Sequence, residues 1–225
     1  MIHVFEKLIP DSLCAKVVKR LEKAEFVDGI GTAGQLDAEL KQNLQLPLRD
    51  PVAREFSGDL VGSLSQSPEF VSAVRLKRMI PPRVNRYDEG MYYAEHLDRV
   101  VMLPGQDNPL RTDISLTICL NSASDYEGGE LVINANGAEH RFRGNAGDVI
   151  VYPSGYVHEV TPVERGTRLV AVSWIQSQIR DAGQRDLAYK LDCSIAALEQ
   201  AGVERKRILE LKEVHGALLR RWLDI

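Results

Sequence analysis

The middle of the chain is a succession of short apolar runs divided by turn residues, and this pattern most restricts the folds available to it. Five of the runs are SLTICL, GELVI, DVIVYP, YVHEV and RLVAVSWI. Short runs rich in Val, Ile, Leu and aromatic residues are typical of an antiparallel β-sandwich or barrel. Turns such as Glu127-Gly128-Gly129 and Ala135-Asn136-Gly137 lie between them, and Gly and Asn tolerate the positive φ of tight turns. We therefore expect a β-rich core over about residues 80–178.

Helical patterns precede this core. An apolar residue recurs at every fourth position over residues 13–21, which predicts a core-packed helix. Val52–Phe70 has the pattern of a second amphipathic helix, and we expect Gly58 and Gly62 to interrupt it. Pro81-Pro82 ends any helical run before the core and is a natural boundary.

The region between the two helices and the C-terminal region differ in character. Residues 26–51 are richer in glycine and polar residues, so turns and loops with one extended piece are expected there. Beyond Gln178, apolar residues return to helical spacing. These apolar residues are Leu187, Leu191, Ile195 and Leu198, then Ile208, Leu211, Val214, Leu218 and Trp222. We expect an α+β fold with one domain over residues 1–178 and a helical region over residues 179–225, whose amphipathic end favours a homodimer or higher homo-oligomer.

Composition excludes several classes of protein. The 225 residues are 44% hydrophobic and carry a net charge of -4 without a long basic block, so a single soluble core is expected and nucleic acid is not an expected partner. Three cysteines stand far apart without a CxxC pair, which favours neither a disulfide framework nor a thiolate zinc site. We found no signal-peptide pattern and no apolar run of membrane-spanning length, so we expect a cytoplasmic protein without a membrane partner.

Metal-binding residues are suggested by the spacing His96-x-Asp98 inside the β-like region. Alternate residues of a strand point to the same face, so the imidazole and the carboxylate can approach one point. His158, after the turn Pro153-Ser154-Gly155, is placed in sequence to supply a third ligand. Two histidines and one carboxylate on one face of Fe(II) leave the opposite positions open. A single histidine is more often a core or surface residue, and His140, in a charged segment, is expected at the surface.

Arg168 supports the same interpretation. It lies ten residues beyond His158 in TRLVAVSWI, a strand with apolar residues on both faces. A buried guanidinium needs an anionic partner, which is either the distal carboxylate of 2-oxoglutarate or an internal Asp or Glu.

The segment YDEGMYYAEHLD, from Tyr87 to Asp98, resembles the Y-x-x-G-x-x-Y-x-x-H-x-D signature of prolyl-4-hydroxylase-type 2-oxoglutarate oxygenases. The segment from Gly147 to Trp174 is similar to the last core strands of that family, with His158 as the distal metal histidine and Arg168 as the 2-oxoglutarate arginine. Together with GGEL at residues 128–131 and the helical tail, the arrangement resembles bacterial PKHD-type hydroxylases over essentially the whole chain.

This resemblance implies a double-stranded β-helix (jelly-roll, cupin-like) that uses Fe(II), 2-oxoglutarate and dioxygen, with L-ascorbate as an accessory reductant. It implies hydroxylation of a protein or small-molecule substrate with release of succinate and CO2, and a link to iron uptake. By position, Tyr87 helps to bind 2-oxoglutarate, and Tyr93 either lines the pocket or packs beneath the metal strand. Cys119 stands where some relatives have a tyrosine that contacts the co-substrate. Trp174 is expected in the core.

Two alternatives use the same residues. Gly147, Pro153, Gly155 and His158 satisfy much of the second cupin motif, which occurs in metal isomerases and small-ligand binding modules. A cupin usually has H-x-H and a later glutamate in its first motif, whereas Asp98 replaces the second histidine here. A non-catalytic 2-oxoglutarate or iron sensor would keep every site residue. Substrate contacts are expected from loops, in particular residues 99–111 and the glycine-rich stretch before residue 50.

Overall fold

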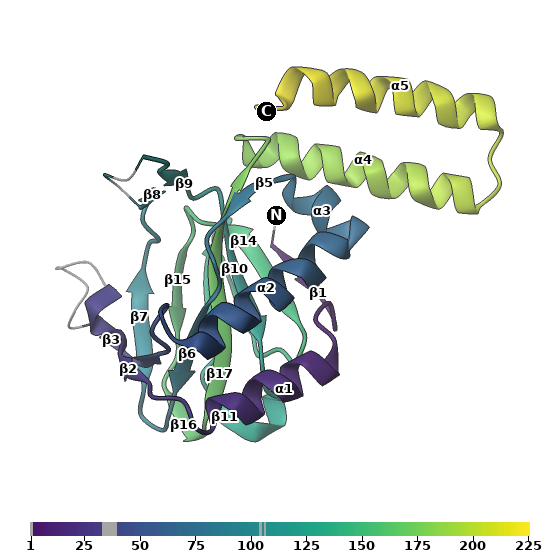
Figure 1. Cartoon of the computed structure of the whole chain (residues 1–225). Helices are drawn as coiled ribbons and strands as arrows, with labels where there is room; N and C mark the ends of the chain where they lie inside the picture. The colour runs from purple at the N-terminus through teal and green to yellow at the C-terminus, as the bar shows by residue number, and fades with distance from the viewer. Residues whose placement is uncertain (1, 33–39, 104, 106) are drawn as a thin grey trace.

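The computed structural model describes residues 2–32, 40–103, 105 and 107–225, and it has helices on one face of a pair of antiparallel sheets. The helices before the sheets are α1 (Asp11–Leu21), α2 (Pro51–Gln66) and α3 (Pro68–Val74). The larger sheet has the order β1-β14-β10-β17-β6-β4-β2, with β5 paired to β17, and the smaller sheet has the order β13-β12-β15-β7-β3. Helices α1 and α2 cover the outer face of the larger sheet (Figure 1).

The strands are short, as the sequence pattern indicated. Those of the larger sheet are β1 (His3–Phe5), β2 (Val27–Asp28), β4 (Leu44–Gln45), β5 (Leu76–Met79), β6 (Arg83–Tyr87), β10 (Ile114–Cys119), β14 (Val149–Pro153) and β17 (Arg168–Ser177). Those of the smaller sheet are β3 (Lys41–Gln42), β7 (Tyr92–His96), β12 (Leu131–Ala135), β13 (Ala138–Phe142) and β15 (Val157–Val160). Two further pairs are β8 (Val101–Met102) with β9 (Leu110–Arg111), and β11 (Tyr126–Gly128) with β16 (Val163–Gly166).

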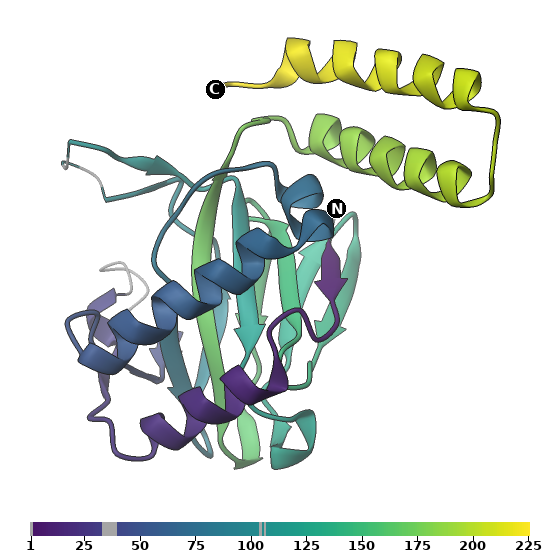
Figure 2. The same ribbon diagram turned by 45° about the vertical axis from the view of Figure 1, so that its right-hand side comes forward.

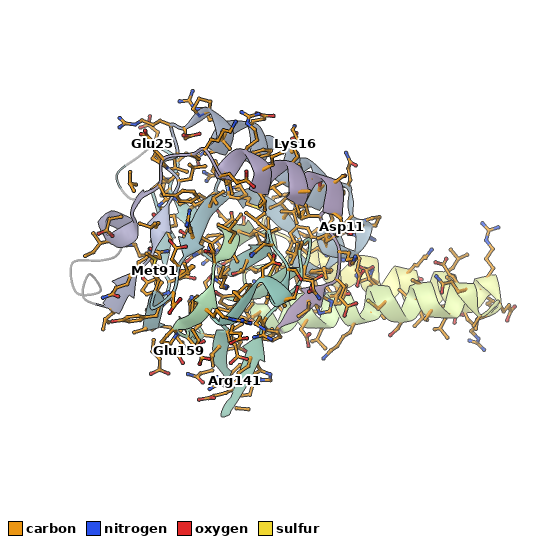
Figure 3. All side chains as sticks on the ribbon, turned by 90° about the horizontal axis from the view of Figure 1, so that it is seen from below. Asp11, Lys16, Glu25, Met91, Arg141 and Glu159 are labelled. Carbon is orange, nitrogen blue, oxygen red and sulfur yellow. The ribbon has the colours of Figure 1, made fainter. Side chains whose placement is uncertain are left out.

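Both faces of the larger sheet are buried, which explains its continuous apolar runs. On β14, Val149 and Val151 belong to the core beneath the helices, whereas Ile150 and Tyr152 belong to a cluster with residues of the smaller sheet. Successive side chains of a strand point to opposite faces, so one strand serves two cores. In Figure 3, Lys16 of α1 and Arg141 of β13 lie on opposite sides of the body.

One short segment connects the two sheets at an edge. Strand β3 pairs with β7 of the smaller sheet, and β4 pairs with β6 of the larger sheet. Because only Asn43 separates β3 from β4, the chain crosses from one sheet to the other between Lys41 and Gln45. Lys41 and Gln45, at the two ends of the crossing, line the space between the sheets. It belongs to the region where turns and an extended piece were expected, of which residues 33–39 lie outside the described part.

The β region begins earlier than expected. All five apolar runs coincide with strands, but β5 pairs with β17 before Pro81-Pro82, and β1 adds an edge strand beside β14. Strand β1 has only three residues, and its pairing depends on a partner almost 150 positions away, so no local pattern identifies it.

The expected interruption of α2 is wrong. The helix runs through Gly58 and Gly62, and nothing lies within 4 Å of a side chain added at either position. The break comes at Ser67, whose backbone is extended before Pro68 and whose hydroxyl accepts a hydrogen bond from Phe70 N as the cap of α3. Glycine in a helix costs about 1 kcal/mol relative to alanine but does not end it.

The C-terminal residues form an antiparallel hairpin of α4 (Ala182–Gln200) and α5 (Arg205–Trp222). The hairpin extends away from the body (Figures 2 and 3). Helix α4 packs on α3, where Tyr189 of α4 donates a hydrogen bond to Glu69 and Asp192 of α4 accepts one from Ser72. Leu187 and Val214 belong to the apolar residues at helical spacing, yet they are 59% and 54% exposed, because the hairpin packs on the body at one end and mainly on itself elsewhere. Within the described residues, no helix is both long and apolar enough to cross a membrane.

Candidate metal centre

The register of the smaller sheet brings His96 and His158 together. Strands β7 and β15 are antiparallel neighbours, and the Cα atoms of these two histidines are direct partners. Asp98 lies two residues beyond the end of β7, so the expectation that it shares a strand with His96 is wrong. One possible ligand atom from each of the three residues lies within 4.8 Å of the others. Elsewhere in the described chain, no group of three or more possible ligands was found.

Backbone carbonyls orient both imidazoles. His96 Nδ1 is 2.8 Å from Ala94 O, and His158 Nδ1 is 3.0 Å from Tyr156 O. A carbonyl oxygen can only accept, so each Nδ1 carries the hydrogen of the neutral ring. Each Nε2 then has a free lone pair, the arrangement that orients histidine for a metal.

Two buried serines hold the carboxylate. Ser115 Oγ donates to Asp98 Oδ2, and Ser154 Oγ lies 2.8 Å from Ser115 Oγ. Asp98 Oδ2 is also 3.7 Å from His158 Nε2. The carboxylate is therefore fixed from the larger sheet while it faces the histidines of the smaller one.

The surroundings keep His96 neutral. Burial, followed by the neighbouring His158, lowers the pKa of His96 to about 4. Tyr93 stacks on the His96 ring, with centroids 3.6 Å apart and planes at 11°. Tyr93 also lines the cavity described next, so both roles considered for it are realised.

A cavity of about 420 Å³ lies between the sheets and contains the His96, Asp98 and His158 side chains on its wall. Strands of both sheets contribute to it, as does the crossing segment. Further lining residues are Lys41, Gln45, Ile80, Arg83, Asn85, Tyr87, Arg99, Met102, Leu103, Thr117, Tyr152, Arg168, Val172 and Trp174. Both loop regions expected to contact substrate, residues 99–111 and the stretch before residue 50, therefore reach the cavity.

Arg168 lies at one end of this cavity as a buried cation. It is 3% exposed, its Nη1 has no hydrogen-bond partner, and no Asp or Glu of the described residues forms an ion pair with it. The alternative of an internal acidic partner is thus not supported in the described chain. The guanidinium lies 5.2 Å from the ring centroid of Tyr87, its Cα partner on β6. Gly129 makes room for it, because an added Cβ there would be 3.1 Å from Arg168 Cδ.

The tyrosines near Arg168 are neutral groups. Burial is the largest cause that raises the pKa of Tyr87 and of Tyr126, and the nearby Arg168 partly opposes it. Neutral phenols can donate hydrogen bonds to an anion. Cys119 is buried and its thiol pKa is raised by burial, but it is absent from the cavity lining.

Several lining residues gave no signal in the sequence. Tyr152 looked like part of an apolar strand, yet it packs edge-on against His158 with centroids 5.0 Å apart. Trp174 was expected in the core, but it lines the cavity. Ser115 could have been found only by noticing that the polar residues of SLTIC alternate with apolar ones, which gives that strand one polar face.

The other histidines have different roles. His140 is exposed on β13, as expected. His3 lies in β1, and its Nε2 is 2.8 Å from Tyr189 Oη. His215 lies on α5 beside Asp192, at 3.2 Å.

Comparison with known sequences agrees with the site. The profile of the 2OG-Fe(II) oxygenase superfamily matches residues 82–176. A PKHD-type hydroxylase from Stenotrophomonas maltophilia (strain R551-3) is 42% identical over 221 residues, covering 96% of this chain and 98% of that protein. A PKHD-type hydroxylase from Herminiimonas arsenicoxydans is 36% identical, with both chains covered completely.

Solved structures are similar at the level of the fold. A Pseudomonas putida prolyl-4-hydroxylase has a TM-score of 0.54 and 21% identity, with 78% of this chain and 92% of that chain covered. A Trichoplax adhaerens prolyl hydroxylase, solved with a peptide of hypoxia inducible factor, has a TM-score of 0.55 and 16% identity, with 77% and 82% covered.

The relatives support the oxygenase interpretation and do not favour the cupin isomerase or the binding module. Members of this superfamily use Fe(II) and 2-oxoglutarate, and a His-Asp-His group suited to the metal is present. The chain therefore belongs to the PKHD-type hydroxylases of the 2OG-Fe(II) oxygenase superfamily, and it is a 2-oxoglutarate-dependent hydroxylase.

Proposed function

We propose that His96, Asp98 and His158 bind the catalytic Fe(II), and that Arg168 with Tyr87 binds the distal carboxylate of 2-oxoglutarate. The observation that carries the proposal is the convergence of three ligand atoms within 4.8 Å on the wall of a cavity that also contains a buried arginine. Two imidazoles and one carboxylate suit Fe(II) and leave coordination positions for co-substrate and dioxygen.

The unpartnered Nη1 of Arg168 supports the second half of the proposal. A buried donor without a partner is costly, and a carboxylate would satisfy it with parallel charge-assisted hydrogen bonds. Tyr87 lies beside the guanidinium and is kept neutral by burial, so its hydroxyl can donate to the same carboxylate.

When bound, the metal and 2-oxoglutarate supply oxidative decarboxylation to succinate and CO2, coupled to hydroxylation of a substrate C–H bond. The residues of the chain hold and orient these groups. Ser115 fixes Asp98, the backbone carbonyls fix both histidines, and Arg168 determines how far 2-oxoglutarate reaches along the cavity. Side chains of both sheets surround the space in which these groups would react.

The test is an anaerobic titration with Fe(II) and 2-oxoglutarate. Chelation of the keto acid should give a weak visible charge-transfer band in the wild-type protein. His96→Ala and Asp98→Ala should abolish the band, whereas His140→Ala, which removes an exposed histidine on β13, should retain it. Absence of the band from folded wild-type protein would refute the metal and co-substrate assignment. Succinate formation with candidate proteins and small molecules would then separate substrates from inactive compounds.

The proposal also covers the type of β fold, the division into domains, the accessory reductant and the cellular role. The order in which consecutive strands alternate between the two sheets, β6, β7, β10 and β12, supports a double-stranded β-helix. We infer a catalytic domain over residues 1–178 and a helical region over residues 179–225 that contributes to a homo-oligomer. The proposal also includes L-ascorbate as accessory reductant, a cytoplasmic location and a link to iron uptake. Because of the proposed link to iron uptake, iron-chelating compounds are the first candidates in the succinate assay.

A further inference from the structure

The cavity has a second group of donors at some distance from Arg168. On β6 and β17, Tyr87 is the Cα partner of Arg168 and Arg83 is the Cα partner of Val172. Four residues of strand separate the two pairs, which corresponds to about 13 Å. Trp174, two residues beyond Val172, extends the second group. All of these side chains line the same cavity.

Two buried donors in this second group have no partner among the described residues. They are Arg83 Nε and Trp174 Nε1. Buried N–H groups are nearly always hydrogen-bonded, so an unpartnered pair in a cavity indicates where a ligand with acceptor atoms binds. The two groups offer donors only, because neither guanidinium nor indole nitrogen can accept.

The charge of the lining also favours an anion. Arg99 is exposed to solvent but reaches the cavity near Arg83, and no ion pair joins either arginine to an acid of the described residues. Burial, followed by the positive charge of Arg99, lowers the pKa of Arg83. Among the described lining residues, Asp98 is the sole acid. The metal and Arg168 together balance 2-oxoglutarate and Asp98, so no acid of the described lining is left to balance Arg83.

On the basis of the proposed function, we propose that Arg83, Arg99 and the Trp174 indole form an anion subsite for the primary substrate, which is a small organic acid. Its acidic group binds this subsite, and a neighbouring C–H bond is presented to the metal. The unpartnered atoms are buried, so the acidic group must enter the cavity. Ile80 and Trp174 supply apolar surface beside Arg83 for the rest of the molecule. An anion also lowers the repulsion between the two arginines.

The experiment uses three probes of nearly equal shape and different charge: benzoate, benzamide and benzamidine. They are titrated anaerobically into the full chain loaded with Fe(II) and saturating 2-oxoglutarate, by calorimetry, while the charge-transfer band is followed. Benzoate should bind about tenfold or more tightly than the neutral and cationic probes, in keeping with charge-assisted hydrogen bonds. The band should persist, because benzoate does not displace 2-oxoglutarate from Arg168.

The variants separate this subsite from the co-substrate site. Arg83→Gln with Arg99→Gln should keep the band at the same 2-oxoglutarate concentration but lose the preference for benzoate. Arg86→Gln is the matched control, because Arg86 lies on the same strand, is absent from the cavity lining and pairs with Asp88 at 2.9 Å. Its preference for benzoate should be unchanged.

Each outcome has a distinct meaning. No band in the wild type refutes the proposed function. With the band present, equal affinity for the three probes, no detectable binding of benzoate, or displacement of 2-oxoglutarate by benzoate refutes the anion subsite. A double variant that needs more 2-oxoglutarate also refutes it, because the arginines would then serve the co-substrate.

Discussion

Ser115 donates a hydrogen bond to Asp98 Oδ2 from the opposite sheet. Ser115 is 2% exposed, so water cannot replace its hydroxyl at low cost. Groups that orient a metal ligand contribute to affinity although they do not touch the metal. We expect Ser115→Ala to weaken binding of Fe(II) by about 10- to 100-fold, measured by anaerobic titration.

Ser177→Ala is the control for this substitution. Ser177 is also buried on β17 and donates to Val74 O at 2.8 Å, but it contacts no member of the metal group. Its loss should lower the free energy of unfolding while metal affinity stays the same. Equal metal affinities of wild type and Ser115→Ala would contradict the orienting role.

Replacement of Arg168 should affect the co-substrate and not the metal. Arg168→Gln removes the charge that a carboxylate would meet in a buried site, a loss of about 2 to 5 kcal/mol, so the Kd for 2-oxoglutarate should rise by about 30-fold or more. The Kd for Fe(II) alone should remain unchanged. Both constants can be measured by anaerobic titration of the charge-transfer band and by competition with Zn(II).

Arg185→Gln provides the matched control for Arg168. Arg185 is also buried, but its Nη1 donates to the backbone oxygens of Ile179 and Arg180. Loss of those bonds should destabilise the start of α4 and leave the 2-oxoglutarate requirement as it was. An unchanged Kd for 2-oxoglutarate in Arg168→Gln would mean that another group binds its distal carboxylate.

His96 should make the metal-free protein less stable in acid. Its ordinary pKa of 6.5 is lowered to about 4 in the folded chain, mainly by burial. Between these values the unfolded chain binds a proton that the folded chain does not, so stability that is complete above pH 6.5 is lost as the pH falls through the folded value. The loss at low pH should be at most about 3 kcal/mol.

Urea unfolding between pH 7 and pH 4 measures this contribution. His96→Gln should show a smaller decrease in unfolding free energy than the wild type over that range. His140→Gln, which removes an exposed histidine on β13, should follow the wild type. If the unfolding free energies of His96→Gln and wild type fell equally between pH 7 and pH 4, His96 would not be the source of the acid sensitivity.

The three candidate metal ligands could be named from sequence because the pattern that points to them is local. His96 and Asp98 are two residues apart, and His158 follows a recognisable turn, so coordination chemistry and the family resemblance were enough to name them, although Asp98 lies beyond the end of β7. The pairing of His96 with His158 across β7 and β15 then followed from the fold. Arg168 was found because a charged residue interrupts an otherwise apolar strand.

In the proposed anion subsite, Arg99 belongs to a loop that was expected to contact substrate, but Arg83 and Trp174 could not be predicted, because they are distant residues that meet only after folding. Arg83 and Trp174 are 91 positions apart and come together through pairing of β6 and β17. Arginine and tryptophan both occur in strands that have no ligand site, so neither residue alone indicates a substrate contact. Strand β1 and the crossing at Lys41–Gln45 were missed for the same reason.

Asp192 should anchor the C-terminal hairpin to the body. Its Oδ2 accepts hydrogen bonds from Ser72 Oγ and Arg75 Nη2 of the α3 region, and its Oδ1 lies 3.2 Å from His215 Nδ1 on α5. Asp192→Ala leaves these mostly buried donors unpaired, so we expect a loss of about 1 to 3 kcal/mol in unfolding free energy.

The part of the chain that loses stability in Asp192→Ala shows whether Asp192 anchors the hairpin or stabilises the whole protein. Hydrogen exchange in Asp192→Ala should accelerate over α5 and the second half of α4, while β10 and β14 keep their protection and metal affinity is unchanged. Asp186→Ala is the control, since Asp186 pairs with Lys190, whose side chain is 67% exposed, and solvent weakens such pairs to less than about 1 kcal/mol. Uniform acceleration in the strands and helices of Asp192→Ala would refute the anchor, because a carboxylate that joins three helices at one point should release those helices first.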